Sequence, residues 1–259
     1  GSILMLDPGA GWIQFAGRGI RSERFYGTGG GTHDLPGVTD ATTVSAYVTG
    51  AAGLTRGLEL WAQLPVHRLR VTDEAQNRSR TGLGDPRVSV RAGPELLGLS
   101  TFPVSMRAGV KVPGSDFPVD SRVLPLSEGQ TDYEVAVEAG STLSGGMYVV
   151  AWAGYRWRTE DTSTGREPGD ERFGHLALGG NLAGIRLELG LEALDGLAPV
   201  QNGIALPASA RRLLQLSPTV GWTAGSGRVE VGVQIPVSGR NLPTGSALSV
   251  GYLMAWGTP

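Results

Sequence analysis

Apolar and polar residues alternate along most of this chain with a period of two. In the segment 58–66, Leu58, Leu60 and Leu64 share one parity, whereas Glu59 and Gln63 share the other. Successive side chains of a β-strand point to opposite faces, so this period predicts strands with one apolar face. The pattern recurs in 44–54, 87–92, 104–112, 132–140, 185–193 and 228–237, and more weakly in 12–26, 147–158, 172–182, 212–223 and 247–256. The sequence therefore predicts about a dozen strands and no convincing amphipathic helix.

The stretch GLGDPRVSVRAG at 82–93 begins like a phosphate-binding glycine loop. Such a loop needs a strand before its glycines and a helix after them, so that backbone N–H groups converge on a phosphate. Here a polar stretch precedes the glycines, Arg87 stands where the pattern needs its third glycine, and strict alternation begins at Val88. The segment is therefore predicted to be a tight turn that leads into a strand.

Long and short connections alternate between the predicted strands. TRG, LSGG, LAG and AGSG are short, whereas connections such as VTDEAQNRSRTGLG and PGSDFPVDSRVLPLSEGQT are long. Outer-membrane barrels have short periplasmic turns and long external loops, whereas a soluble sandwich has no reason for this regularity. We therefore predict an all-β, up-and-down antiparallel transmembrane β-barrel of about 12 strands, with both termini periplasmic. Residues 1–259 are predicted to form this single domain.

The width of the barrel indicates which face points outward. Side chains easily fill a barrel of about eight strands, so Val, Leu, Ala and Gly would under-fill an interior made by about twelve. An apolar belt in lipid around a polar lumen removes this difficulty. Outward aromatic residues are predicted to form two interfacial girdles, although ordinary β-propensity is the alternative explanation. They are Tyr133, Tyr155 and Trp157 near the loops, and Trp222 and Trp256 near the turns.

Composition excludes several classes of site. The formal net charge of −2 gives no general electrostatic reason to expect nucleic acid as a partner. The absence of Cys excludes disulfides and thiolate metal sites. No run of about 18 apolar residues is present, so a helical membrane span is excluded, whereas a barrel would show no such run. Gly1 and Ser2 are expected to be a remnant of expression engineering.

Several segments resemble one family of barrels. GLGDPRVSV, KVPGSDFPVD, LPLSEGQTDYEVAVEAG, YVVAWAGYRWR and GRNLPTGSALSVGYLMAWG are similar to outer-membrane transporter-like barrels of the meta-pathway phenol degradation type. The resemblance covers nearly the whole chain and rests on turn and strand signatures. It implies a Gram-negative outer-membrane barrel that passes hydrophobic or aromatic small molecules. The chain departs from the usual final aromatic residue, because Thr258 and Pro259 follow Trp256 and Gly257.

The inward faces of neighbouring strands carry opposite charges. Antiparallel pairing would bring Lys111 near Asp132 or Glu134, and Arg107 near Glu138. Two interpretations remain open: a charged constriction that selects solutes, or a salt-bridge ladder that holds the barrel shut. The predicted lumen residues are Arg87, Arg91, Arg107, Lys111, Asp132, Glu134, Glu138, Arg156 and Arg158. Trp61, Tyr148 and Trp152 share the inward parity and form either an aromatic wall for a ring-bearing solute or packing filler.

A catalytic site is not expected. A hydrolase needs a nucleophile in contact with a base and a third group that orients the base. The three histidines, His33, His67 and His175, are scattered, and none has a serine two positions away. We therefore predict no catalytic residue, no metal site and no cofactor.

These observations favour a pore or channel for passive uptake of small, hydrophobic or aromatic molecules through a charge-lined lumen. The alternatives are a closed structural or docking barrel whose external loops bind a partner, and, less favoured, an outer-membrane lipid hydrolase. Expected partners are the lipid bilayer with its lipopolysaccharide, or detergent, a small-molecule solute, and the barrel-assembly machinery that inserts such proteins. The apolar stretch PVDSRVLPL indicates that the loop 113–131 can fold inward.

Overall fold

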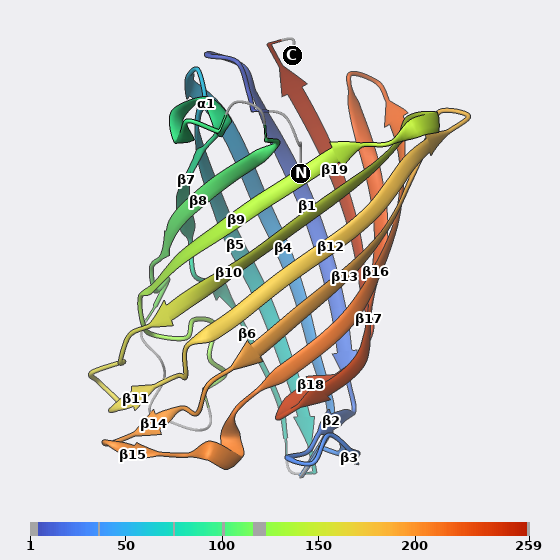
Figure 1. Ribbon diagram of the computed structural model, residues 1–259. Coiled ribbons are helices and arrows are strands. Elements are labelled where there is room, and N and C mark those ends of the chain that lie inside the picture. The colour runs from blue at the N-terminus through green and yellow to red at the C-terminus, as the bar shows by residue number, and fades with distance from the viewer. Residues whose placement is uncertain (1–4, 36, 75, 100–101, 116–122, 258–259) are drawn as a thin grey trace.

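Long antiparallel strands close into one barrel (Figure 1). The computed structural model describes residues 5–35, 37–74, 76–99, 102–115 and 123–257. Gly1 and Ser2, the expected expression remnant, lie outside the described residues, as do Thr258 and Pro259. No described helix is long and apolar enough to cross a membrane.

Each barrel strand pairs with the one before it, and the last pairs with the first. The pairing of β1 with β19 runs from Gly11 opposite Trp256 to Ile20 opposite Ala247 and closes the barrel. The prediction of an up-and-down barrel of 12 strands is therefore confirmed. The described barrel strands are β1 (Gly11–Ser22), β4 (Val38–Thr55), β5 (Leu58–Asp73), β7 (Arg87–Ala92), β8 (Val104–Lys111), β9 (Asp132–Thr142), β10 (Met147–Arg158), β12 (Glu171–Leu182), β13 (Ile185–Gly196), β16 (Arg212–Ala224), β17 (Gly227–Arg240) and β19 (Ala247–Trp256).

The two ends of the barrel differ as the loop lengths predict. One end, here called the turn end, carries the start of β1, the end of β19, short turns and the four-residue helix α1 (Pro94–Leu97). One of its two-residue hairpins joins β12 to β13 through Ala183 and Gly184, whose φ angles of 51° and 82° suit such a turn. The other, loop end carries the small strands β2 (Arg24–Tyr26), β3 (Thr32–Asp34), β11 (Arg166–Glu167), β14 (Val200–Gln201), β15 (Ile204–Ala205) and β18 (Leu242–Thr244).

One predicted loop is mostly strand. The stretch VTDEAQNRSRTGLG continues β5 to Asp73 and returns as β6 (Asn77–Leu83), which pairs with β5 from Val66 to Thr72. Alternation did not indicate this hairpin, because its outward residues are polar beyond the apolar belt. The backbone pairing of the two strands nevertheless continues there. Gly84 still donates its backbone N–H to Pro65 of β5, and Pro86, which has no N–H to donate, then interrupts this edge before β7 resumes on it. The predicted strand after GLGDP is thus confirmed.

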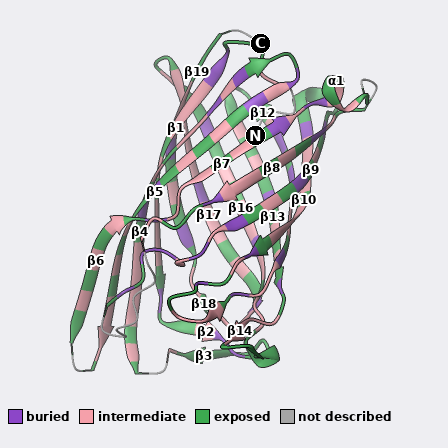
Figure 2. Ribbon diagram, turned by 90° about the vertical axis from the view of Figure 1, so that its left-hand side faces the viewer, coloured by how far each residue is buried: buried purple, intermediate pink, exposed green. Residues whose placement is uncertain are grey.

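Burial in this barrel is inverted relative to a soluble domain (Figure 2). Glu59 and Glu171 on the inward face are 1% and 0% exposed. Leu178 and Leu189 at the middle of their strands are 47% and 53% exposed. The apolar face therefore points outward and the charged face points into the lumen, as the width of the barrel predicts.

Candidate functional site: the barrel lumen

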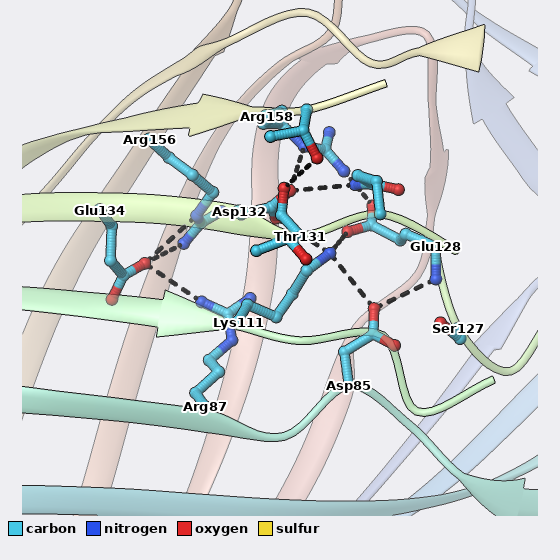
Figure 3. A network of polar contacts seen from close by, with 12 residues as sticks. Asp85, Arg87, Lys111, Ser127, Glu128, Thr131, Asp132, Glu134, Arg156 and Arg158 are labelled. Carbon is cyan, nitrogen blue, oxygen red and sulfur yellow. Dashed lines mark hydrogen bonds and ion pairs between the residues drawn. The ribbon is translucent and has the colours of Figure 1, made fainter. Parts of the chain in front are cut away.

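A network of ion pairs crosses the lumen toward the loop end (Figure 3). Lys111 Nζ, at the end of β8, lies 2.9 Å from Asp132 Oδ2 and 3.2 Å from Asp85 Oδ2. The same ammonium group lies 2.6 Å from Glu128 Oε2. Arg158 Nη2 reaches Glu128 Oε1 at 2.5 Å. The strand wall and the connection between β8 and β9 are therefore held together by charge-assisted contacts.

Glu171 is the most buried carboxylate of this network, with none of its side chain exposed. Arg156 Nη1 lies 2.7 Å from its Oε2, and Arg158 Nη1 lies 3.4 Å from its Oε1. Arg211 Nε also donates to Oε1, at 2.5 Å. Arg156 in addition binds Glu134, with Nη2 3.1 Å from Oε2. Three guanidinium groups at the loop end thus share one carboxylate as a counter-charge.

A second network lies deeper, nearer the turn end. Arg91 Nε is 2.8 Å from Glu138 Oε2, and Arg91 Nη1 is 3.4 Å from Glu59 Oε2. Arg107 Nε contacts Glu138 Oε1 at 3.2 Å, and Trp61 Nε1 donates to Glu59 Oε2 at 2.7 Å. Glu138 is shared by two arginines, and Glu59 also accepts the backbone N–H of Leu6 at 2.5 Å, so both buried carboxylates have partners.

The predicted lumen residues thus separate into two networks. The register places Lys111 against Asp132 and Arg107 near Glu138, as antiparallel pairing predicts, whereas Glu134 contacts Arg87 at 3.3 Å rather than Lys111. Arg87, Lys111, Asp132, Glu134, Arg156 and Arg158 lie in the loop-end network, and Arg91, Arg107 and Glu138 lie in the deeper one. Their role in selectivity stays a prediction.

Sequence reasoning missed five charged members of these networks. Three of them lie outside the barrel strands, where no alternation or register indicates what they face. Glu59 had the inward parity, and Glu171 is one residue before the segment predicted to start at 172, so alternation alone could have found both. The missed residues are Glu59, Asp85, Glu128, Glu171 and Arg211.

Aromatic rings form two contacting groups in the lumen. Trp12 meets Trp61 edge to face with ring centroids 5.0 Å apart. On the opposite wall, His175 stacks on Trp152 at 5.3 Å, and Phe173 meets the same indole at 5.7 Å. Trp61 and Trp152 were predicted on this wall. Trp12, Phe173 and His175 were missed, although Phe173 and His175 share one parity of a predicted strand.

Tyr148 has a different environment from the two tryptophans. Its hydroxyl donates to Glu188 Oε2 at 2.5 Å, and the guanidinium of Arg186 lies over its ring, 4.5 Å from the centroid. The side chain is therefore part of a polar contact at the turn end of the lumen. It shares the inward face with Trp152 but does not extend the same aromatic surface.

Three cavities share the lumen. The central one, of about 400 Å³, is lined by Trp61, Trp152, Phe173, Arg107 and Arg156, among others. A smaller one of about 190 Å³ lies beside it and also meets Trp61 and Trp152. The largest, of about 690 Å³, lies toward the turn end, where Trp12 and Trp61 both line it. Trp61 borders all three cavities, so its indole stands where they meet.

The connection between β8 and β9 folds onto the loop end of the lumen. Asp85 accepts hydrogen bonds from the backbone N of Gly114 at 3.0 Å and of Glu128 at 3.1 Å. Ser127 and Gln130 are buried. The described parts of the loop predicted to fold inward, 113–115 and 123–131, are thus held against the wall. Residues 116–122, which hold part of PVDSRVLPL, lie outside the described residues.

Glu128 lies outside the barrel strands and is the carboxylate of this connection that reaches the lumen network. Burial alone would raise the pKa of its carboxyl group. Arg158, Lys111 and Arg211 outweigh that effect and hold the pKa well below its usual range. The side chain is therefore ionised at neutral pH and bonds the connection to cations from several elements.

The predicted girdle residues lie at the ends of strands on the outward face. Tyr133 and Trp157 are directly opposite each other at the loop end and are 53% and 46% exposed. Tyr155 packs against Trp157 with ring centroids 4.9 Å apart. Trp222 and Trp256 lie at the turn end, also exposed. That these rings mark the two membrane interfaces stays a prediction.

The fold brings together one serine and histidine that are far apart in the sequence. No serine lies two positions from a histidine, but Ser45 Oγ is 2.8 Å from His67 Nδ1 across β4 and β5, a contact that spacing along the chain does not indicate. Among the described residues, no carboxylate is hydrogen-bonded to the other nitrogen of this imidazole. The third, orienting group of a hydrolytic site is therefore missing from that part of the chain. The described residues also contain no cluster of three or more His, Asp or Glu arranged to hold a metal ion.

Comparisons with known proteins agree with this architecture. Residues 22–252 match the family described as "Putative MetA-pathway of phenol degradation". The fold is similar to an outer membrane channel from Pseudomonas putida F1, with a TM-score of 0.80 and 15% identity over 99% of this chain and 98% of that one. It is also similar to the translocator domain of the autotransporter NalP from Neisseria meningitidis, with a TM-score of 0.54 and 10% identity over 98% and 91% of the two chains. A search of curated protein sequences finds no match.

These comparisons bear on two predictions. The chain has the fold of an outer-membrane β-barrel, as predicted. The first of the two neighbours is described as an outer membrane channel, which is consistent with the prediction that this chain is not an enzyme.

Replacing Glu171 should destabilise the barrel. We expect Glu171→Gln to lower the free energy of unfolding by about 3 kcal/mol, because Arg156, Arg158 and Arg211 would lose their shared buried counter-charge. Urea unfolding of the protein in lipid vesicles measures this change. The matched control is Asp195→Asn, whose exposed carboxylate lies 3.9 Å from Arg172 and should contribute less than about 0.5 kcal/mol. Equal effects of the two substitutions would contradict a structural role for the Glu171 network.

Glu128 should keep its connection docked down to low pH. Because the folded pKa lies below the ordinary value of 4.5, ionised Glu128 stabilises docking above pH 4.5, and this stabilisation is lost only as the pH falls through the lower folded value. The chain has no Cys, so Ser127→Cys supplies a buried reporter thiol. We expect this thiol to react with a soluble thiol reagent slowly between pH 7 and pH 5, and quickly at both pH values when Glu128→Gln is added. Rates are normalised to the unfolded chain, and Glu160→Gln, in an exposed loop position, should leave them unchanged.

Proposed function

This chain belongs to the family described as putative MetA-pathway of phenol degradation, and we propose that it is a channel for passive uptake of small molecules across a Gram-negative outer membrane. The observation that carries the proposal is the lumen itself. Cavities of about 400 Å³ and 690 Å³ occupy the barrel where a soluble protein would pack an apolar core, and they meet at Trp61. A solute that enters either cavity contacts the same indole.

The charges of the lumen support passage of solutes with little net charge. Arg87 and Arg156 both contact Glu134, and Arg107 contacts Glu138. Because these cations of the central cavity already have carboxylate partners, an ion in transit gains little from any one of them. The paired charges of the lumen then order water and small polar groups and do not hold an ion.

The aromatic rings support a ring-bearing solute. Trp152 and Phe173 line the central cavity together with Trp61, and the guanidinium of Arg156 lies over the Phe173 ring, 5.0 Å from its centroid. A flat aromatic molecule gains offset or edge contacts with such rings, and a hydroxyl group on it has charged partners within the same cavity. The phenol named in the family description has both features.

A closed docking barrel is the second candidate. The observation that favours it is Glu128, which joins Lys111 and Arg158 and so ties the connection between β8 and β9 across the loop end. If these contacts block the lumen, the small strands of the loop end become the surface that a partner would meet.

Single-channel recording in a planar bilayer separates the two candidates. We expect the refolded protein to give a steady conductance whose cation-to-anion preference shifts in opposite directions with Glu134→Gln and Arg107→Gln, since each removes one sign of charge from the central cavity. Arg172→Gln, at an exposed position of β12, is the control and should not change the preference. A correctly folded protein that leaves the bilayer silent would overturn the channel and support the docking barrel.

The same recording reports on the solute. Phenol added at millimolar concentration should reduce the open-channel current, because it occupies the aromatic wall. Trp152→Ala should weaken this block about three- to tenfold, the value of one lost aromatic contact. Trp222→Ala removes an indole from the outward face and serves as the matched control. A block of equal strength in both variants would show that the ring of Trp152 does not bind the solute.

A further inference from the structure

The outward face of β5 changes abruptly from apolar to cationic. Leu60, Leu64 and Val66 point away from the lumen and are 38%, 44% and 39% exposed. The next two outward residues are Arg68 and Arg70, both exposed. Figure 2 shows that β4 and β6 extend beyond the neighbouring strands at the loop end, and the hairpin of β5 and β6 carries the two arginines there.

The strands beside β5 offer these arginines no carboxylate directly opposite. On β4, Arg68 faces Val44 and Arg70 faces Thr42. On β6, the directly opposite residues are Thr81 and Ser79. Hydroxyl residues therefore flank Arg70 on both sides and Arg68 on the β6 side, and no residue directly opposite either arginine carries a negative charge.

The nearest acidic residue in this register is already occupied. Asp40 lies diagonally from Arg70 on β4, and its Oδ1 accepts a hydrogen bond from Arg21 Nε at 3.0 Å and another from Thr42 Oγ1 at 3.3 Å. Arg21 also contacts Glu23 at 2.9 Å. Within the described residues, no ion pair joins Arg68 or Arg70 to a carboxylate.

Arg68 and Arg70 lie at the level expected for the lipid head groups. The outward apolar residues of β5 run from Leu58 to Val66, eight steps of about 3.3 Å each. With a strand tilt of about 40°, this stripe covers about 20 Å of the outward apolar band, which is about 25 Å tall in such barrels. Arg68 and Arg70 follow the stripe toward the loop end, which faces the exterior in an outer-membrane barrel.

We propose that Arg68 and Arg70 bind the phosphate of a phosphorylated lipid in the outer leaflet. Two guanidinium groups on one face of a strand, two residues apart, offer forked donors that match phosphate oxygens. The hydroxyls of Ser79 and Thr81 on β6 supply further donors at the same level. The acyl chains of such a lipid would lie along the apolar stripe below. This inference needs the outer-membrane location but not transport through the lumen.

Lipid retention measured by native mass spectrometry tests the site. The full chain, refolded in neutral detergent, is mixed with lipid A that carries two phosphates, or with the same lipid after enzymatic removal of both. We expect the wild-type protein to retain the phosphorylated lipid and to bind the dephosphorylated one at least tenfold more weakly. Arg68→Gln combined with Arg70→Gln should weaken binding of the phosphorylated lipid at least tenfold.

The control variant is Arg172→Gln, which removes an outward arginine near the loop end of β12 that is paired with Asp195. It should bind the phosphorylated lipid within twofold of the wild type. Inorganic phosphate at 100-fold excess should not displace the lipid, because the apolar stripe also holds its chains; displacement would show that the site takes free phosphate instead. Equal binding by the wild type and the double variant, or equal loss in Arg172→Gln, would overturn the proposal. Heat-modifiable migration on a gel confirms that each variant is folded.

Discussion

Inside this barrel, a buried charged side chain needs an oppositely charged or hydrogen-bonding partner, because a charge that is removed from water without one is costly. Glu171, with no exposed surface, meets Arg156, Arg158 and Arg211. Antiparallel pairing supplies such partners on neighbouring strands at distances that long side chains span. A charge left alone in the same place would cost several kcal/mol, about as much as a whole domain has to spare.

The same requirement shapes the loop end. Asp85 interrupts the edge of β5 between β6 and β7, and its carboxylate accepts two backbone N–H groups from the connection after β8 while it contacts Lys111. Glu128 of that connection then completes the network from the other side. The mouth and the wall of the barrel are therefore one electrostatic unit.

Alternation and loop length were enough for the architecture. The period of two along 44–54 or 132–140 specifies which residues share a face, and the alternation of shorter and longer connections specifies an up-and-down order. Antiparallel pairing in this order also predicts the contacts of Lys111 with Asp132 and of Arg107 with Glu138, and both form. These are local properties, and each depends on residues a few positions apart or on two adjacent strands.

Other contacts depend on which strands pair and in which register. Glu59 contacts Arg91 because β5 pairs directly with β7, a pairing that the chain interrupts with the hairpin of β6. Trp152 and His175 stack, and Ser45 meets His67, only because one register among several was realised. Arg211 and Glu128 come from loops, where no periodicity indicates direction. The sequence by itself thus determined the faces and the order of the strands, whereas closure and register, set by the cooperative pairing of all strands, decided which charges and rings meet in the lumen.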